Sequence, residues 1–168
     1  MNYETSGEIE IAIARWFGIR KYVIVPNVSW GFLPYEADML ILTKSNYVWE
    51  VEIKVSRSDL LRDGNKRHQH NTPKVRKLWF AIPEKLEGCI EQIPERAGVL
   101  VVDRTGRITT SSRSPTANPI ARKLSDEECF QLARLGALRI WALKEKVAKL
   151  ASKQTKPERD RLTNDKAN

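Results

Sequence analysis

The spacing of hydrophobic residues along this chain predicts a mixture of helices and strands. Apolar residues at helical spacing predict a helix over residues 5–17, which Gly18 ends, and a long amphipathic helix over about residues 126–152. A shorter helix is expected from about residue 57, after a serine cap. Runs rich in β-branched and aromatic residues predict strands at 22–27, 36–43, 46–55, 77–83 and 97–103, with a hairpin partner at 107–112.

The order of these elements, α-β-β-β-α-β followed by β-β-α, predicts the fold class. The turn at residues 44–46 makes the strands on either side of it a hairpin. The strands at 77–83 and 97–103 are continuous apolar runs, which are typical of the centre of a sheet. We therefore expect an α/β fold in which helices flank both faces of a mixed central sheet.

One predicted strand carries an unusual row of charges. Strict alternation over residues 48–56 puts Val51, Ile53 and Val55 on one face and Glu50, Glu52 and Lys54 on the other. This pattern predicts a half-buried strand with three charges on its second face. Taken alone, such a row is explained by an exposed sheet face with cross-strand ion pairs.

Asp38, on the preceding strand, changes that interpretation. It shares a face with Leu40 and Leu42, which is unusual for a solvated position because a buried carboxylate needs a partner. Paired strands lie about 4.8 Å apart, so the hairpin would bring Asp38 beside Glu52 or Lys54. Two carboxylates at this separation can share one cation.

The spacing D-x13-E-x-K supplies the groups that phosphodiester hydrolysis requires. Mg²⁺ is commonly held by one or two carboxylates and sits against phosphate oxygens. Asp38 and Glu52 would hold Mg²⁺ or Mn²⁺, and Lys54 would orient the attacking water or neutralise charge that develops on the phosphate.

These residues resemble the PD-(D/E)xK nuclease superfamily, whose core is α-β-β-β-α-β with the acidic and lysine residues on the second and third strands. The segments YEADMLIL, EVEIKVSRSDLLRD, NKRHQH, LWFAIPEKL and GVLVVD look like those of MmcB-type bacterial DNA-repair proteins, over about residues 5 to 110. The resemblance implies a restriction-endonuclease-like fold and a DNA endonuclease or repair nuclease. Ala37 departs from the pattern, because a proline would precede the aspartate.

The resemblance also implies roles for individual residues. Asp38 and Glu52 would be metal ligands, Lys54 the catalytic lysine, and Glu8 on the first helix a further catalytic residue, with Glu10 the next choice. Glu8 would also stabilise the start of its helix without any catalytic role. DNA contacts would come from the segment after the catalytic lysine, through Ser56, Arg57, Lys66, Arg67, His68, Gln69 and His70. For the two histidines, phosphate contact or solvation is favoured over metal ligation.

Composition sets the wider limits. The chain has 168 residues, which suits a single domain over 1–152, with a disordered basic tail expected over 153–168. The net charge of +8 favours an anionic partner such as DNA, but half of it comes from residues 144–168, where eight basic residues face four acidic ones. We expect no membrane partner, because no apolar run approaches about 20 residues.

The N-terminus lacks a secretory signal, and two widely spaced cysteines, Cys89 and Cys129, are expected to be free thiols. We therefore expect a cytoplasmic protein, encoded by a bacterium or a phage. Cleavage of both strands of a duplex would favour a homodimer, and the long last helix would pack on the sheet or on a second copy. Two other functions fit the sequence: a DNA-binding protein of the same fold that does not cut, and a protein-interaction factor with an inert charged face.

Overall fold

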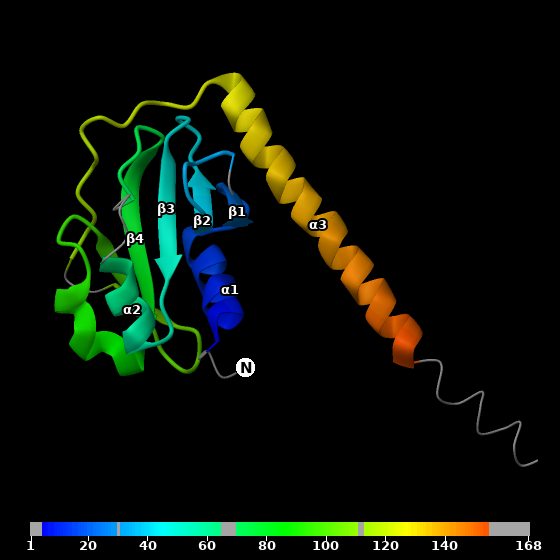
Figure 1. Cartoon of the computed structure of the whole chain (residues 1–168), viewed down its shortest axis with the longest axis horizontal. Helices are drawn as coiled ribbons and strands as arrows, with labels where there is room; N and C mark the ends of the chain where they lie inside the picture. Colours follow the sequence, from blue (N-terminus) through cyan, green and yellow to red (C-terminus); the bar gives the residue numbers. More distant parts are fainter. Residues whose placement is uncertain (1–4, 30, 65–69, 111–112, 155–168) are drawn as a thin grey trace, which may run out of the picture.

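The computed structural model describes residues 5–29, 31–64, 70–110 and 113–154. The chain folds into a six-stranded mixed sheet with helices on both faces (Figure 1). In chain order the elements are α1 (Ser6–Phe17), β1 (Val23–Val28), β2 (Ala37–Leu42), β3 (Val48–Ile53), α2 (Arg57–Gly64), β4 (Val75–Pro83), the 3₁₀ helix η1 (Glu84–Gln92), β5 (Gly98–Val102), β6 (Ile108–Thr110) and α3 (Asp126–Gln154). The predicted element order and the mixed sheet are confirmed.

The strands lie side by side in the order of the sequence. β1, β2 and β3 form an antiparallel meander, β3, β4 and β5 are parallel, and β6 closes the sheet as an antiparallel hairpin partner of β5. The predicted hairpin of residues 36–43 and 46–55 is therefore present as β2 and β3. Asn46, in the turn between them, adopts a left-handed φ of 61°, which asparagine tolerates better than most residues.

Three helix starts are capped by a serine or threonine side chain. The Thr5 side chain accepts a hydrogen bond from the backbone N–H of Glu8 at the start of α1. Ser56 accepts from Asp59 N at the start of α2, and Ser125 accepts from Glu128 N at the start of α3. Each cap satisfies an N–H that has no partner within its own helix.

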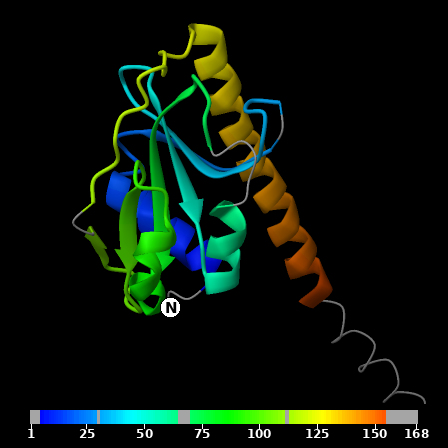
Figure 2. The same ribbon diagram turned by 60° about the vertical axis from the view of Figure 1, so that its left-hand side comes forward.

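The two faces of the sheet have different covers (Figure 2). α1 packs on one face, against inward side chains of β2, β3, β4 and β5 that include Met39, Val51, Ala81 and Leu100. The opposite face carries two separate apolar clusters. One of them joins β1 and β2 to α3 through residues such as Leu40 and Leu132, and the other joins β4 and β5 to α2 and η1.

α3 is a long helix of which only the first half packs on the sheet. Leu132 is fully buried against β1 and β2, whereas Leu138 and Trp141 are more than half exposed. The expected packing of this helix on the sheet is therefore present in its first half but not around Trp141, because the helix runs past the sheet edge (Figure 1). Among the described residues, no helix combines the length and the apolar run that a membrane crossing requires.

Candidate metal-binding active site

The row of charges on β3 lies inside the molecule, between the two apolar clusters of the same sheet face. Glu50 is 0 %, Glu52 1 % and Lys54 5 % exposed. The prediction of a half-buried strand is therefore wrong, because β3 is covered on both faces. The cover comes from segments distant in sequence, including Tyr35 before β2 and His70 before β4.

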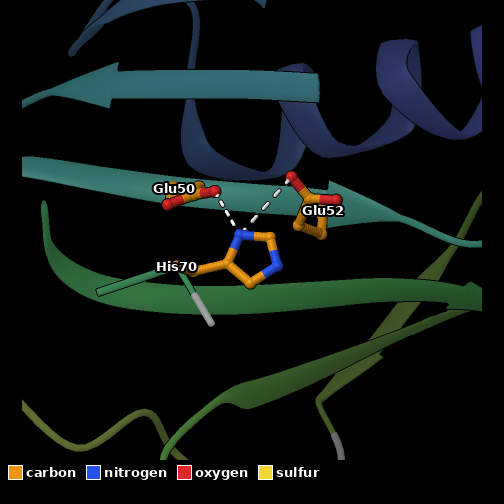
Figure 3. A group of neighbouring side chains, drawn as sticks. All are labelled: Glu50, Glu52 and His70. Atoms are coloured by element: carbon orange, nitrogen blue, oxygen red, sulfur yellow. Dashed lines mark hydrogen bonds and ion pairs between the residues drawn. The ribbon is translucent and has the colours of Figure 1, made fainter. Parts of the chain in front are cut away.

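Glu50 is held by two side chains that approach it from different segments. The Tyr35 hydroxyl donates to Glu50 Oε2 at 2.8 Å, and His70 Nδ1 lies 2.7 Å from Glu50 Oε1 (Figure 3). An ionised Glu50 can only accept a hydrogen bond, so Nδ1 must then be the protonated ring nitrogen and the donor. Burial, and then the charge of Glu50, raises the pKa of the Tyr35 hydroxyl above its ordinary value, so this group remains a donor.

His70 occupies a closed position under β3. Its ring lies edge-on to Tyr35 and to Phe80, with centroid separations of 5.5 and 6.0 Å, and it is 1 % exposed. Its backbone is left-handed, with a φ of 53°. The prediction that His70 contacts nucleic acid or solvent is therefore wrong for this structure, because the side chain presents no surface to either.

Glu52 lies between Glu50 and Lys54 in the row and contacts both Lys54 and His70. Its Oε2 accepts a hydrogen bond from Lys54 Nζ at 2.8 Å, and its Oε1 lies 3.8 Å from His70 Nδ1. Removing charged groups from water is costly unless each is paired. Two buried carboxylates beside an ammonium group and an imidazole satisfy that condition, and they also concentrate strong ligand groups in a small volume.

The side chains of Glu50, Glu52 and His70 could hold a metal ion. One ligand atom from each lies within 4.8 Å of the others, and all three point toward one another (Figure 3). Carboxylate oxygen together with imidazole nitrogen is a ligand set that suits Mn²⁺, Fe²⁺ or Zn²⁺ as well as harder ions. The buried part of the site thus has a possible metal centre that includes Glu52 but not Asp38.

Asp38 lies at the same end of the hairpin as Glu52. The pairing of Leu40 with Glu50, continued by two residues, sets Asp38 opposite Glu52. Asp38 Oδ2 accepts a hydrogen bond from the backbone N–H of Ile53 at 2.7 Å, which fixes its carboxylate beside the Glu52–Ile53 peptide. The structure therefore brings together three of the predicted site residues, Asp38, Glu52 and Lys54.

Asp38 is half-buried and faces open space. It lines a cavity of about 200 Å³ whose other wall residues are Asn27, Val28, Ser29, Glu36, Ala37 and Arg139. The Arg139 guanidinium, from α3, donates to the backbone carbonyl of Asn27 at this cavity. A carboxylate and a guanidinium therefore line the same cavity at the open side of the site.

The two glutamates of α1 have different surroundings. Glu8 Oε2 accepts from the backbone N–H and the hydroxyl of Thr5, which completes a capping box at the start of the helix. Glu10 instead accepts a hydrogen bond from Asn27, which lines the same cavity as Asp38. Burial, and to a lesser extent the charge of Asp38, raises its pKa above the ordinary glutamate value, while a hydrogen bond from Asn27 at 3.4 Å opposes the shift. The geometry therefore favours Glu10 over the predicted Glu8.

The residues predicted to contact DNA are only partly described. Ser56 is half-buried and caps α2, and Arg57 is exposed in the first turn of that helix. Lys66, Arg67, His68 and Gln69 lie outside the described residues, as do residues 155–168 of the predicted tail. The predicted domain boundary at residue 152 falls two residues before the last residue of α3, Gln154.

Four site residues were not predicted in these positions: Tyr35, Glu50, His70 and Arg139. Glu50 had one signal, its place in the charged row. The sequence around Tyr35 and Arg139 has no feature that distinguishes them from other loop and helix residues. Their positions depend on the loop before β2 and on the angle at which α3 leaves the sheet.

Comparisons with known proteins support the fold but assign no family. No family model matches the chain, and no curated protein matches it. A solved structure of SPO1766, a protein of unknown function from Silicibacter pomeroyi, is similar with a TM-score of 0.56 and 17% sequence identity. The match covers 86% of this chain and 89% of that chain, so the similarity extends over nearly the whole fold.

Proposed function

We propose that this protein is a metal-dependent nuclease that hydrolyses phosphodiester bonds in DNA. The observation that carries the proposal is the buried ion pair between Glu52 and Lys54, 2.8 Å long, at the end of β3 where Asp38 is fixed against Ile53 N. If this strand face were an ordinary solvent-exposed one, Glu52 and Lys54 would be in contact with water, whereas both are buried. The element order of α1 to β4, with these residues on the second and third strands, supports a restriction-endonuclease-like fold.

The residues at the open side fit a hard divalent ion. Asp38 and Glu52 would hold Mg²⁺ or Mn²⁺ through carboxylate oxygens, and Glu10 is the α1 glutamate whose surroundings include Asp38. A bound ion would supply positive charge to a phosphate oxygen and lower the pKa of a bound water.

Lys54 and Arg139 would supply the remaining positive charge. Lys54 is held beside Glu52, so its ammonium group is fixed where charge develops on the scissile phosphate. Arg139 lines the cavity beside Asp38, where a guanidinium can donate two hydrogen bonds to one phosphate group. Tyr35 and His70 hold Glu50, and His70 Nδ1 also lies 3.8 Å from Glu52 Oε1, so this group would help to keep the Glu52 carboxylate in place.

A second ion position is supported by the cluster of Glu50, Glu52 and His70. An ion there would be bound by an imidazole nitrogen, a ligand that favours transition-metal ions such as Mn²⁺ over Mg²⁺. We favour the Asp38 side, because that carboxylate lines a cavity that a phosphate could enter, whereas the inner cluster is buried.

DNA is the substrate that the net charge of +8 and the sequence resemblance support. Two alternatives use the same fold differently. A DNA-binding protein without cleavage would keep the buried charges as a structural network. A protein-interaction factor would have no affinity for DNA at moderate salt.

A nuclease panel separates these three functions. The protein is incubated with duplex, single-stranded, flap and junction DNA, with Mg²⁺, with Mn²⁺ or with a chelator. We expect products on at least one substrate, only when an ion is present. Lys54→Ala should lower the rate by about 100-fold or more, whereas Lys44→Ala, at an exposed lysine of the β2–β3 turn, should leave it unchanged.

The other outcomes are also decisive. DNA binding that weakens with salt, without products from any substrate, would support the inactive DNA-binding protein. An absence of both binding and products would support the interaction factor.

A further inference from the structure

The second half of α3 carries a narrow apolar stripe that is exposed to solvent. Ile140, Leu143, Val147 and Leu150 are 57 to 65 % exposed. Their spacing of three, four and three residues places all four side chains on one face of the helix. This is the a/d spacing of a coiled-coil helix, over about two heptads.

The stripe continues the face by which the same helix packs on the sheet. Leu132 is buried on that face, and Gly136 comes so close to β1 that an added Cβ would lie 3.3 Å from Val25. Leu132, Gly136, Leu143 and Leu150 are four or seven residues apart. The helix therefore presents one continuous contact face, of which the sheet covers the first half, and the second half runs past the sheet edge (Figures 1 and 2).

Basic residues border the stripe on both sides. Lys144 lies next to Ile140 and Val147, and Lys146 lies next to Leu143 and Leu150, because residues three or four apart are neighbours on a helix. Between residues 139 and 152 there are four basic residues, Arg139, Lys144, Lys146 and Lys149, and one acidic residue, Glu145. Glu145 is not three, four or seven residues from Ile140, Leu143 or Leu150, so it points away from the stripe.

This charge pattern disfavours a second copy of the chain as the partner. Two such helices packed along their stripes would place basic side chains against basic side chains in either orientation. The narrow stripe also differs from the broad apolar face by which helices lie in a membrane surface. Trp141 is outside the stripe, and Lys144 Nζ lies over its ring at 5.1 Å.

We propose that the exposed stripe of α3 binds an amphipathic helix of a partner protein whose apolar side chains are bordered by carboxylates. The apolar side chains of the two helices would interdigitate, and the carboxylates would pair with Lys144 and Lys146. The proposal is independent of the nuclease function, because neither the four residues of the stripe nor Lys144 and Lys146 belong to the candidate active site.

Two synthetic peptides test the proposal. Both have three heptads with Leu and Ile at a and d; one has Glu at e and g, and the other has Lys there. Like charges keep each peptide from pairing with itself. In a fluorescence anisotropy titration, the full chain should bind the Glu peptide about tenfold or more tightly than the Lys peptide, and the difference should shrink as salt rises.

Matched variants assign the binding to the stripe. Leu143→Asp/Val147→Asp should abolish binding of the Glu peptide, whereas Ile120→Asp, at an exposed apolar residue outside α3, should not change it. Lys144→Glu/Lys146→Glu should reverse the preference toward the Lys peptide. Circular dichroism checks that each variant keeps its helix content.

Three results would overturn the proposal. The first is equal affinity for the two peptides. The second is a dimer in sedimentation that Leu143→Asp/Val147→Asp dissolves, which would make a second copy the occupant. The third is stripe-dependent binding to phosphatidylglycerol vesicles without binding of either peptide, which would make a lipid surface the occupant.

Discussion

His70 Nδ1 lies 2.7 Å from Glu50 Oε1, and both side chains are almost completely removed from solvent. A buried hydrogen-bonded pair of this kind is costly to break when only one member is removed, because the other then keeps a polar group without its partner in an apolar environment. The pair also joins β3 to the segment before β4, 20 residues further along the chain.

We expect His70→Ala and Glu50→Ala each to lower the free energy of unfolding by about 3–5 kcal/mol. Glu50→Leu combined with His70→Leu should cost less than the sum of the two single changes, because no buried group is then left without its partner. Urea denaturation measures all three. Losses below about 1 kcal/mol for both single variants would mean that the pair is not formed or is solvated.

The position of the metal ion can be tested by comparing Asp38 with His70. If Asp38 and Glu52 hold the ion, Asp38→Asn should weaken Mn²⁺ binding by about tenfold or more, whereas His70→Gln should have a smaller effect through the orientation of Glu52. Isothermal titration calorimetry measures both affinities. The opposite order would place the ion at Glu50, Glu52 and His70.

The two glutamates of α1 form a matched pair of tests. Glu10→Gln should weaken Mn²⁺ binding and slow DNA cleavage, because it removes a negative charge next to Asp38. Glu8→Gln should change neither, since glutamine can replace glutamate in a capping box. Equal losses for the two variants would indicate that they act through the stability of α1.

Glu128 gives a prediction for pH. Its carboxylate accepts two hydrogen bonds from Arg122, at 2.6 and 2.7 Å, and lies 3.2 Å from Lys74. The bond from Arg122 is the main cause that holds the pKa of Glu128 far below the ordinary value of 4.5, with a further contribution from the backbone N–H of Ser125. A lowered pKa in the folded state stabilises the fold above the unfolded pKa, and this stability is lost as pH falls.

At neutral pH, Glu128→Gln should therefore lower the free energy of unfolding by about 1 kcal/mol. The difference from the parent protein should shrink progressively below pH 4.5. Chemical denaturation at several pH values measures it, with Glu145→Gln as the control at an exposed position of the same helix. A difference that does not depend on pH would contradict the ionic origin of this contact.

The elements of this fold were predictable from short segments of sequence because their signals are local. Alternation at residues 48–56 identified β3, and apolar periodicity identified α1, which Gly18 ends, and α3. The pairing of β2 with β3 followed from the short turn between them. It was enough to predict that Asp38 lies beside Glu52 or Lys54, and the observed register sets it opposite Glu52.

The burial of the charged row was not predictable in this way. Alternation cannot distinguish a solvated face from one covered by polar partners, and the partners here, Tyr35 and His70, lie 15 and 20 residues from Glu50. The path of α3 relative to the sheet was unpredictable for the same reason, because it depends on contacts between segments that are distant in sequence. Its periodicity predicted an amphipathic helix, but the length of sheet available to cover it is set by β1.

In the proposed function, Glu52 helps to hold an ion that DNA hydrolysis requires, and both candidate ion positions include this residue. The most direct test is the rate of Mn²⁺-dependent DNA cleavage by Glu52→Gln, measured beside the parent and Glu87→Gln, at an exposed glutamate of η1. The account predicts that Glu52→Gln loses cleavage by about 100-fold or more while Glu87→Gln retains it. Cleavage by Glu52→Gln at the parental rate, or a parent protein that cuts no DNA with any divalent ion, would contradict it.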